Sequence, residues 1–175
     1  LQQLLRKLRA AAARAEAQRR AAAKAERSAP RANGATPRKP AAVASAAPLQ
    51  VGGLGWPLSG ALLAGYGARM PDGRGSDGLL IAANAGAPVK AVADGSVVYA
   101  EWMTGYGLLL IVDHGNGYMS LYAHNDALLK DVGAAVKRGD TVSTVGSSGG
   151  QGRPALYFEL RRNGQPVNPN VWLRR

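Results

Sequence analysis

Residues 146–162 read GSSGGQGRPALYFELRR, and this stretch decides which fold the chain can take. Its second half alternates between two sets of side chains, which in a β-strand would point to opposite faces. The first set is Leu156, Phe158 and Leu160, and the second is Ala155, Tyr157, Glu159 and Arg161. We expect the first set to be core and the second to be displayed. The small residues at 146–152 let the backbone turn and approach closely, which is typical of a loop beside a site.

Short strand candidates fill this stretch and the chain on its N-terminal side. They lie at residues 61–66, 79–82, 88–92, 95–101, 107–113, 119–124, 141–145 and 155–161. Turn pairs such as Asp94-Gly95 and Asn116-Gly117 separate nearly all of them. A helical turn fits only around residues 125–130. The pattern predicts a mainly β domain over 51–175, an antiparallel β-sandwich or sheet stack.

Residues 1–28 have a different composition, rich in Ala, Arg, Gln, Glu and Lys with no Gly or Pro. Apolar residues there follow helical spacing, which predicts the end of a coiled coil whose partner helix lies upstream. The plainer alternative is a solvated single helix that frays. Residues 29–50 contain four prolines among small and polar residues, which favours a linker or a regulatory arm.

The charge of the chain is concentrated in this N-terminal region. The formal net charge is +11, and residues 1–48 contribute +9 of it through eleven basic and two acidic side chains. The folded part is therefore nearly neutral, which argues against a nucleic-acid-binding domain. An arm that binds nucleic acid or acidic lipid is disfavoured because residues 1–28 contain no aromatic side chain.

The lack of cysteine and the lack of a long apolar run exclude several classes of protein. The chain has no cysteine, which excludes disulfides, thiolate metal sites and cysteine nucleophiles. It also has no apolar run near the ~20 residues of a membrane-spanning helix. It begins with Leu1, and nothing near that residue looks like a signal peptide. We expect a fragment of a longer protein, with any export signal lying upstream.

Several motifs in order resemble the LytM, or lysostaphin-like, zinc endopeptidases of bacterial cell walls, the M23 peptidase family. The matching segments are GWPL at 55–58, GYGAR at 65–69, GAPVKAVADGSV at 86–97, DHGNGY at 113–118, LYAH at 121–124, KRGDTV at 137–142 and RPALYFE at 153–159. The resemblance covers residues 56–172 and implies the fold of that family.

The same resemblance implies that the zinc site has been lost. Family members bind zinc through H-x-G-x-D and the second His of H-x-H, and these three ligand positions correspond here to Ser76, Leu80 and Tyr157. Leu80 cannot bind any metal, and a neighbouring carboxylate, Asp77, is one residue out of register. One further catalytic histidine of the family corresponds to Ala155. We therefore expect no metal, no cofactor and no peptidase activity.

A groove that has lost the metal ligands of an active site can still bind a protein partner. Tyr and Arg are the residue types that dominate protein interfaces. The candidate partner-binding residues are Leu80, Tyr106, His124, Arg153, Tyr157 and Arg161. The alternative is that Tyr157 fills the empty metal cavity, that Arg161 pairs with Glu159 or solvent, and that His124 only packs. His114 lies in a turn-forming sequence and is expected to be structural or exposed.

A degenerate domain of this kind behind a coiled coil resembles the EnvC-type murein hydrolase activators of Gram-negative bacteria. That resemblance implies a periplasmic protein that activates N-acetylmuramoyl-L-alanine amidases during septal peptidoglycan splitting and daughter-cell separation. It implies recruitment to a membrane protein of the division complex through the coiled coil, and an arm, for which residues 1–50 are candidates, that covers the groove. Two alternatives stay open: a zinc-dependent peptidoglycan endopeptidase with unorthodox ligands, and a peptidoglycan-binding module.

Overall fold

The structure, a computed structural model, describes residues 6, 7, 9, 10, 13, 14, 17, 20, 24, 54–70, 73, 75–150 and 152–174, with only the backbone of Arg174. The described residues before 25 are all helical and exposed. The predicted helix over 1–28 thus lies only partly within the described residues, and the predicted linker at 29–50 lies outside them. Among the described residues, no helix has both the length and the apolar character needed to span a membrane.

The strands that the sequence predicts are all present. They are β2 (Leu62–Ala64), β3 (Leu79–Ala82), β4 (Pro88–Lys90), β5 (Gly95–Met103), β6 (Gly107–Gly115), β7 (Tyr118–Leu128), β9 (Thr141–Val145) and β10 (Ala155–Arg162). The sequence did not indicate the short elements β1 (Leu54–Gly55), β8 (Ala135–Val136), β11 (Gln165–Val167), α2 (Pro169–Trp172) and β12 (Leu173–Arg174). These have four residues or fewer, too short for a periodic pattern.

The helical turn expected at residues 125–130 was wrong, because β7 continues to Leu128. Its last residues pair with β9, where Asn125 lies opposite Val145 and Leu128 opposite Ser143. The Asn125 amide nitrogen donates to the carbonyl oxygens of Leu108 and Tyr122, both at 2.8 Å. These tertiary hydrogen bonds hold the segment extended against its neighbours and override its local preference.

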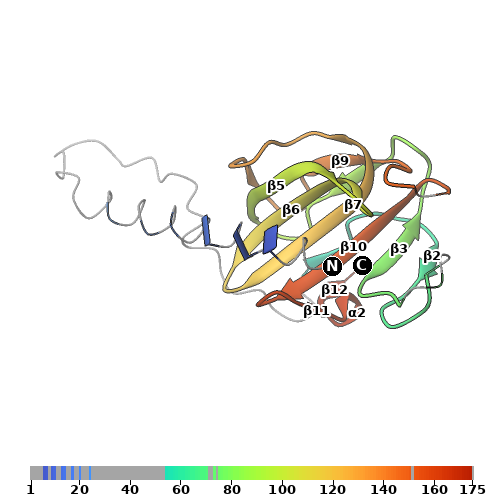
Figure 1. Cartoon of the computed structure of the whole chain (residues 1–175), viewed down its shortest axis with the longest axis horizontal. Coiled ribbons are helices and arrows are strands. Elements are labelled where there is room, and N and C mark those ends of the chain that lie inside the picture. The colour runs from blue at the N-terminus through green and yellow to red at the C-terminus, as the bar shows by residue number, and fades with distance from the viewer. Residues whose placement is uncertain are drawn as a thin grey trace.

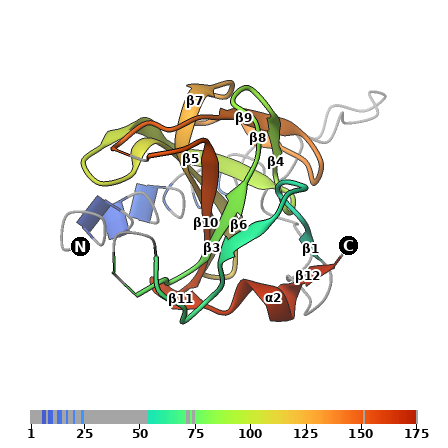
Figure 2. The same cartoon turned by 90° about the vertical axis from the view of Figure 1, so that its right-hand side faces the viewer.

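A single branched sheet forms the body of the domain. Its strands follow the order β2-β3-β10-β7-β6-β5-β8, while β9 pairs with both β7 and β4, and β11 pairs with β10. In Figure 1, β10, β7 and β6 lie side by side across the domain, and Figure 2 shows β4 running beside β9. The fold is mainly β and mostly antiparallel, as predicted. The sheet branches at β7, which pairs with β10, β6 and β9.

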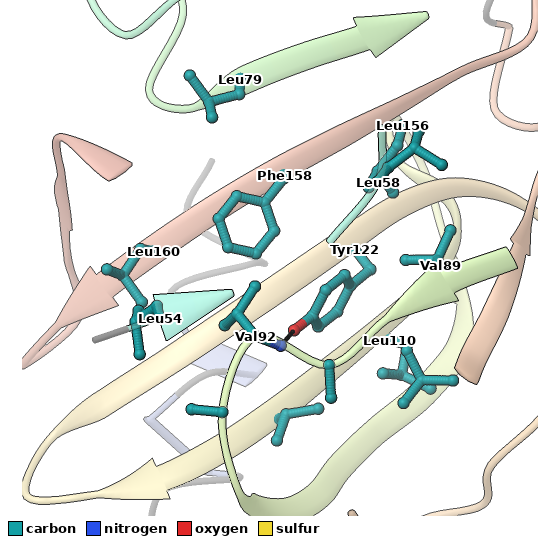
Figure 3. Packing of buried hydrophobic residues seen from close by; sticks show 14 of the residues in the cluster. Leu54, Leu58, Leu79, Val89, Val92, Leu110, Tyr122, Leu156, Phe158 and Leu160 are labelled. Atoms are coloured by element: carbon teal, nitrogen blue, oxygen red, sulfur yellow. Dashed lines mark hydrogen bonds between the residues drawn. The ribbon is translucent and has the colours of Figure 1, made fainter. Parts of the chain in front are cut away.

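The first hydrophobic cluster lies on one face of β10. Leu156, Phe158 and Leu160 are fully buried there, as the alternation predicts. Phe158 packs against Tyr122 of β7, with ring centroids 5.4 Å apart. Figure 3 shows these side chains pointing toward Val89 and Val92, which lie on and just after β4. This cluster is the main core of the domain.

A second hydrophobic cluster covers the opposite face of β10, where the sequence had suggested a displayed surface. That expectation was wrong: Ala155, Tyr157, Glu159 and Arg161 are all at least 92 % buried. The other members of the second cluster are Ala64, Leu80, Tyr99, Met103, Leu109, Ile111, Met119, Leu121 and Ala123. Leu63, Met70 and Tyr106 pack against them from flanking segments. Strand β10 is therefore buried on both faces, which strand alternation alone does not reveal.

His114 is buried at the end of β6, neither exposed nor at the apex of its turn. Its Nδ1–H donates to the Asp94 carbonyl at 2.8 Å, because a carbonyl oxygen can only accept. The Nε2 atom then accepts from the Ser120 hydroxyl, 2.7 Å away. Ser120 lies 2.9 Å from the Tyr122 hydroxyl, and that hydroxyl accepts the Val92 N–H at 3.1 Å, the bond drawn in Figure 3.

With a neutral imidazole, and with the Tyr122 hydroxyl turned to donate to Ser120, every group of this buried chain has a hydrogen-bond partner. A protonated His114 would have to donate from Nε2, which would reverse the Ser120 hydroxyl and leave the Tyr122 proton without an acceptor. Burial lowers the pKa of His114, and its bond to the Asp94 carbonyl and the charges of Asp113 and Asp94 oppose that effect. The native state therefore resists protonation of this residue.

We predict that the domain loses stability as the pH falls below about 6.5, where an unfolded histidine takes up a proton. The unfolded state then binds more protons than the folded state, so the free energy of unfolding falls by up to about 1.4 kcal/mol per pH unit. Urea unfolding across this pH range, in the natural chain and in His114→Gln, measures the effect. The variant should be less stable at neutral pH but have a flatter pH profile. An equally steep profile in His114→Gln would contradict the assignment.

Candidate functional site

Three strands meet at Tyr157, in the middle of the second hydrophobic cluster. The register of the sheet places Tyr157 opposite Leu80 on β3 and opposite Ala123 on β7. Leu80 and Ala123 are almost completely buried, and 8 % of Tyr157 is exposed. Two of the three positions that the sequence marked as lost zinc ligands, 80 and 157, are therefore direct neighbours across the sheet.

The hydroxyl of Tyr157 is held along its own strand. It donates to Oε1 of Glu159 at 2.6 Å, and Nε of Arg161 donates to Oε2 of the same carboxylate at 2.7 Å. Arg161 also donates from its guanidinium to the Gly164 carbonyl at 2.9 Å. Burial raises the pKa of Tyr157, and the negative charge of Glu159 raises it further. Tyr157 is thus a neutral hydrogen-bond donor at every physiological pH.

The ion pair between Glu159 and Arg161 is deeply buried, with 1 % and 5 % of the two side chains exposed. Removing one partner of such a pair costs about 3–5 kcal/mol, because the other charge is left in the protein interior. The sequence had left open whether Arg161 is displayed or pairs with Glu159, and the structure shows the pairing. Arg161 therefore fixes Glu159, and through it the orientation of Tyr157.

Two further rings face Tyr157. Tyr106, in the turn between β5 and β6, lies 6.3 Å from it between ring centroids, and His124 of β7 also lies at 6.3 Å. Tyr106 is half-buried, so its ring forms the accessible edge of this group. We call Leu80, Tyr106, His124 and Tyr157 the aromatic face. The structure thus brings together four of the six residues proposed from the sequence.

His124 is fixed by its backbone and by its ring. Its φ of +62° lies in the left-handed region, which non-glycine residues rarely adopt. Its N–H donates to the Tyr106 carbonyl at 2.7 Å, and its Nδ1–H donates to the Ser148 carbonyl at 2.7 Å. These two hydrogen bonds, one to the turn and one to the glycine-rich loop, keep the backbone of His124 in this strained conformation.

The residues at the former ligand positions do not fit a catalytic zinc ion, which needs three protein ligands and an open position. Leu80 has no donor atom, and the Tyr157 hydroxyl is directed to Glu159. Ser76 is buried in the bend before β3, where its hydroxyl donates to the Gly78 carbonyl at 2.8 Å. Asp77 is half-buried, and its charge contributes to the raised pKa of Tyr157. Within the described part of the chain, no group of three His, Cys, Asp or Glu side chains could hold a metal.

The two arginines proposed from the sequence do not lie together on the aromatic face. Arg161 lies along β10 beyond Glu159, and Arg153 is exposed in the segment before β10. Sequence reasoning missed two residues that shape the site. One is Glu159, which it treated only as a possible partner of Arg161. The other is Ser148, which it counted only as one of the small residues of the loop at 146–152.

Comparison with known proteins extends this picture. The profile of "Peptidase family M23" matches residues 74–169. The "Murein hydrolase activator EnvC" of Escherichia coli is 49 % identical over 133 residues, which are 72 % of this chain and 32 % of that protein. The "Murein hydrolase activator NlpD" of the same species is 40 % identical over 119 residues, 67 % of this chain and 30 % of that protein. The chain thus spans about a third of the length of these curated relatives.

Solved structures show the same fold. A zinc-containing peptidase from Vibrio cholerae matches with a TM-score of 0.61 and 28 % sequence identity, over 67 % of this chain and 39 % of that one. The chain is therefore similar both to an enzyme that contains zinc and to proteins named as activators.

Proposed function

The chain belongs to peptidase family M23, and we propose that it is a non-catalytic member that activates periplasmic N-acetylmuramoyl-L-alanine amidases. In this role it promotes septal peptidoglycan splitting and daughter-cell separation. Two relatives named murein hydrolase activators, at 49 % and 40 % identity, support activation as the role. The single observation that carries the non-catalytic part is the arrangement of Leu80 and Tyr157, which offers a metal no ligand.

The proposed partner-binding surface is the aromatic face together with Arg153, which is exposed in the segment before β10. Tyr106 is half-buried and Arg153 is exposed, so a partner reaches these two without rearrangement. Tyrosine and arginine bury large areas and still form hydrogen bonds, which suits an interface centre. Tyr157, His124 and Leu80 form the buried floor of the aromatic face, and Arg161 supports that floor through Glu159.

We also propose that residues 1–50 act as a regulatory arm over this side of the sheet. The Nζ atom of Lys7 lies 3.3 Å from the Tyr99 hydroxyl and 5.2 Å from the centroid of its ring. Tyr99 belongs to the same hydrophobic cluster as Tyr157. An arm at this place would compete with a partner for the sheet face. Release of the arm would therefore raise the stimulation of the amidase. The upstream coiled coil would bind a membrane protein of the division complex, and peptidoglycan itself is a further candidate partner.

We predict that dye-labelled peptidoglycan releases dye when this chain and a periplasmic amidase are mixed, and much less with either alone. Tyr106→Ala and Arg153→Glu should lower the stimulation at least about fivefold, because hot-spot residues contribute more than about 1 kcal/mol. Tyr157 and Arg161 are too buried for this purpose, since their replacement would test stability first. The measurement is the initial rate of dye release.

Lys137→Glu is the matched control, because Lys137 is exposed and lies between β8 and β9, elsewhere in the fold. It should stimulate like the natural chain. Residues 51–175 alone should stimulate more strongly than the whole chain if the arm inhibits, and both described hydrophobic clusters lie within that domain. Normal stimulation by both Tyr106→Ala and Arg153→Glu would show that the partner binds a different surface. Retention on isolated cell-wall sacculi without any stimulation would favour a peptidoglycan-binding module.

We predict further that the purified natural chain carries no stoichiometric zinc, whereas the triple variant Ser76→His, Leu80→Asp, Tyr157→His gains zinc binding. Positions 80 and 157 are cross-strand neighbours, so an Asp and a His placed there can reach one ion. Metal analysis of dialysed protein measures the occupancy. One zinc per natural chain, together with chelator-sensitive dye release by this protein alone, would instead establish an endopeptidase with unorthodox ligands.

A further inference from the structure

Ser148 lies where three segments of the domain meet. Its hydroxyl donates to the Asn125 carbonyl of β7 at 2.6 Å and accepts the Leu108 N–H of β6 at 3.0 Å. Its own carbonyl accepts the Nδ1–H of His124 at 2.7 Å. One residue of the loop at 146–150 therefore satisfies polar groups of both strands and of the imidazole. We call these three contacts the Ser148 junction.

Two glycines make this junction possible. Gly107, with φ of +67°, begins β6, and a Cβ there would overlap the Ser148 hydroxyl. Gly149, with φ of +78°, faces it, and a Cβ there would overlap the Gly107 nitrogen. The loop and the turn thus pack backbone against backbone, which only residues without a side chain permit. The small residues of the loop thus allow the close backbone approach that the sequence predicts.

The junction reaches the aromatic face through Tyr106. Tyr106 directly precedes Gly107, and its carbonyl accepts the N–H of His124 at 2.7 Å. Its ring lies 6.3 Å from Tyr157, and the His124 ring lies at the same distance on that tyrosine. Two of the three rings of the aromatic face are therefore placed by segments that Ser148 ties together. The third ring, Tyr157, is placed independently by Glu159.

We propose that Ser148 is a positioning residue of the partner-binding surface. It fastens the loop at 146–150 to the turn that carries Tyr106 and to the ring of His124, and so fixes the rings on which a partner docks. This inference rests on the proposed function, because it concerns the same surface. A preformed surface binds more tightly because less conformational freedom is lost on binding. Loss of the hydroxyl would leave the Leu108 N–H and the Asn125 carbonyl without this partner and would release the turn.

The test compares Ser148→Ala with Ser147→Ala, its exposed neighbour, in the amidase stimulation assay. It is run with the 175-residue chain and with residues 51–175. For Ser148→Ala, the concentration that gives half-maximal stimulation should rise at least about fivefold, while the stimulation at saturation stays near the natural value. Ser147→Ala should match the natural chain. Equal effects of both substitutions would overturn the proposal.

A second pair of variants disturbs the junction without removing the hydroxyl. Gly107→Ala and Gly105→Ala both place a side chain at positive φ in the same turn, at +67° and +88°. Only the first meets Ser148, since a Cβ at position 105 has no atom within 4 Å. Gly107→Ala should therefore raise the concentration that gives half-maximal stimulation, as Ser148→Ala does. Gly105→Ala should raise that concentration much less. The reverse order would contradict the proposal.

Amide hydrogen exchange separates a positioning role from general destabilisation. In Ser148→Ala the Leu108 amide should exchange faster, while the amides of β3 and β10 keep their natural protection. If the Ser148→Ala variant kept the natural protection of the Leu108 amide and the natural concentration for half-maximal stimulation, the inference would be overturned. The proposed function would remain intact. If the natural chain stimulates no amidase in either length, the proposed function and this inference fall together.

Discussion

The carboxylate of Glu159 is the constraint on which the rest of the site depends. It is buried on the face of β10 that carries the second hydrophobic cluster, where an isolated charge would be strongly destabilising. Arg161 balances its charge through a 2.7 Å contact, and Tyr157 donates to its other oxygen at 2.6 Å. Both partners lie on the same strand, two residues to either side, so the β-strand repeat itself brings the three together. The tyrosine ring is held over Leu80, at a place where a metal ligand would be needed.

The walls of the site are the turn that carries Tyr106 and the glycine-rich loop. The Ser148 hydroxyl joins this loop to β6 and to β7. His124 keeps a strained backbone conformation between them. The floor and the walls are thus fastened by separate sets of hydrogen bonds, one through Glu159 and one through Ser148.

Much of the fold could be predicted from the sequence because it is local. Alternation at Leu156, Phe158 and Leu160 and the turn pairs between strands indicated β-structure and located each longer strand. What could not be predicted depends on contacts distant in sequence. The burial of Tyr157 and Arg161 requires knowing that Leu63, Met70 and Tyr106 cover the second face. The extended course of Asn125 depends on carbonyl groups of β6 and β7, and the roles of His114 and Ser148 depend on partners up to 40 residues away.

The measurement that tests the central claim most directly is a double-mutant cycle on the buried ion pair. It compares the free energies of urea unfolding of the natural chain, Glu159→Gln, Arg161→Met and the double variant. If Glu159 is the constraint, the loss of Arg161 alone should cost about 3 kcal/mol or more, since it leaves a buried charge uncompensated. The double variant should then be more stable than the sum of the single losses predicts, with a coupling of about 2 kcal/mol or more. Additive losses would show that the two charges do not depend on each other, and would contradict this account of the site.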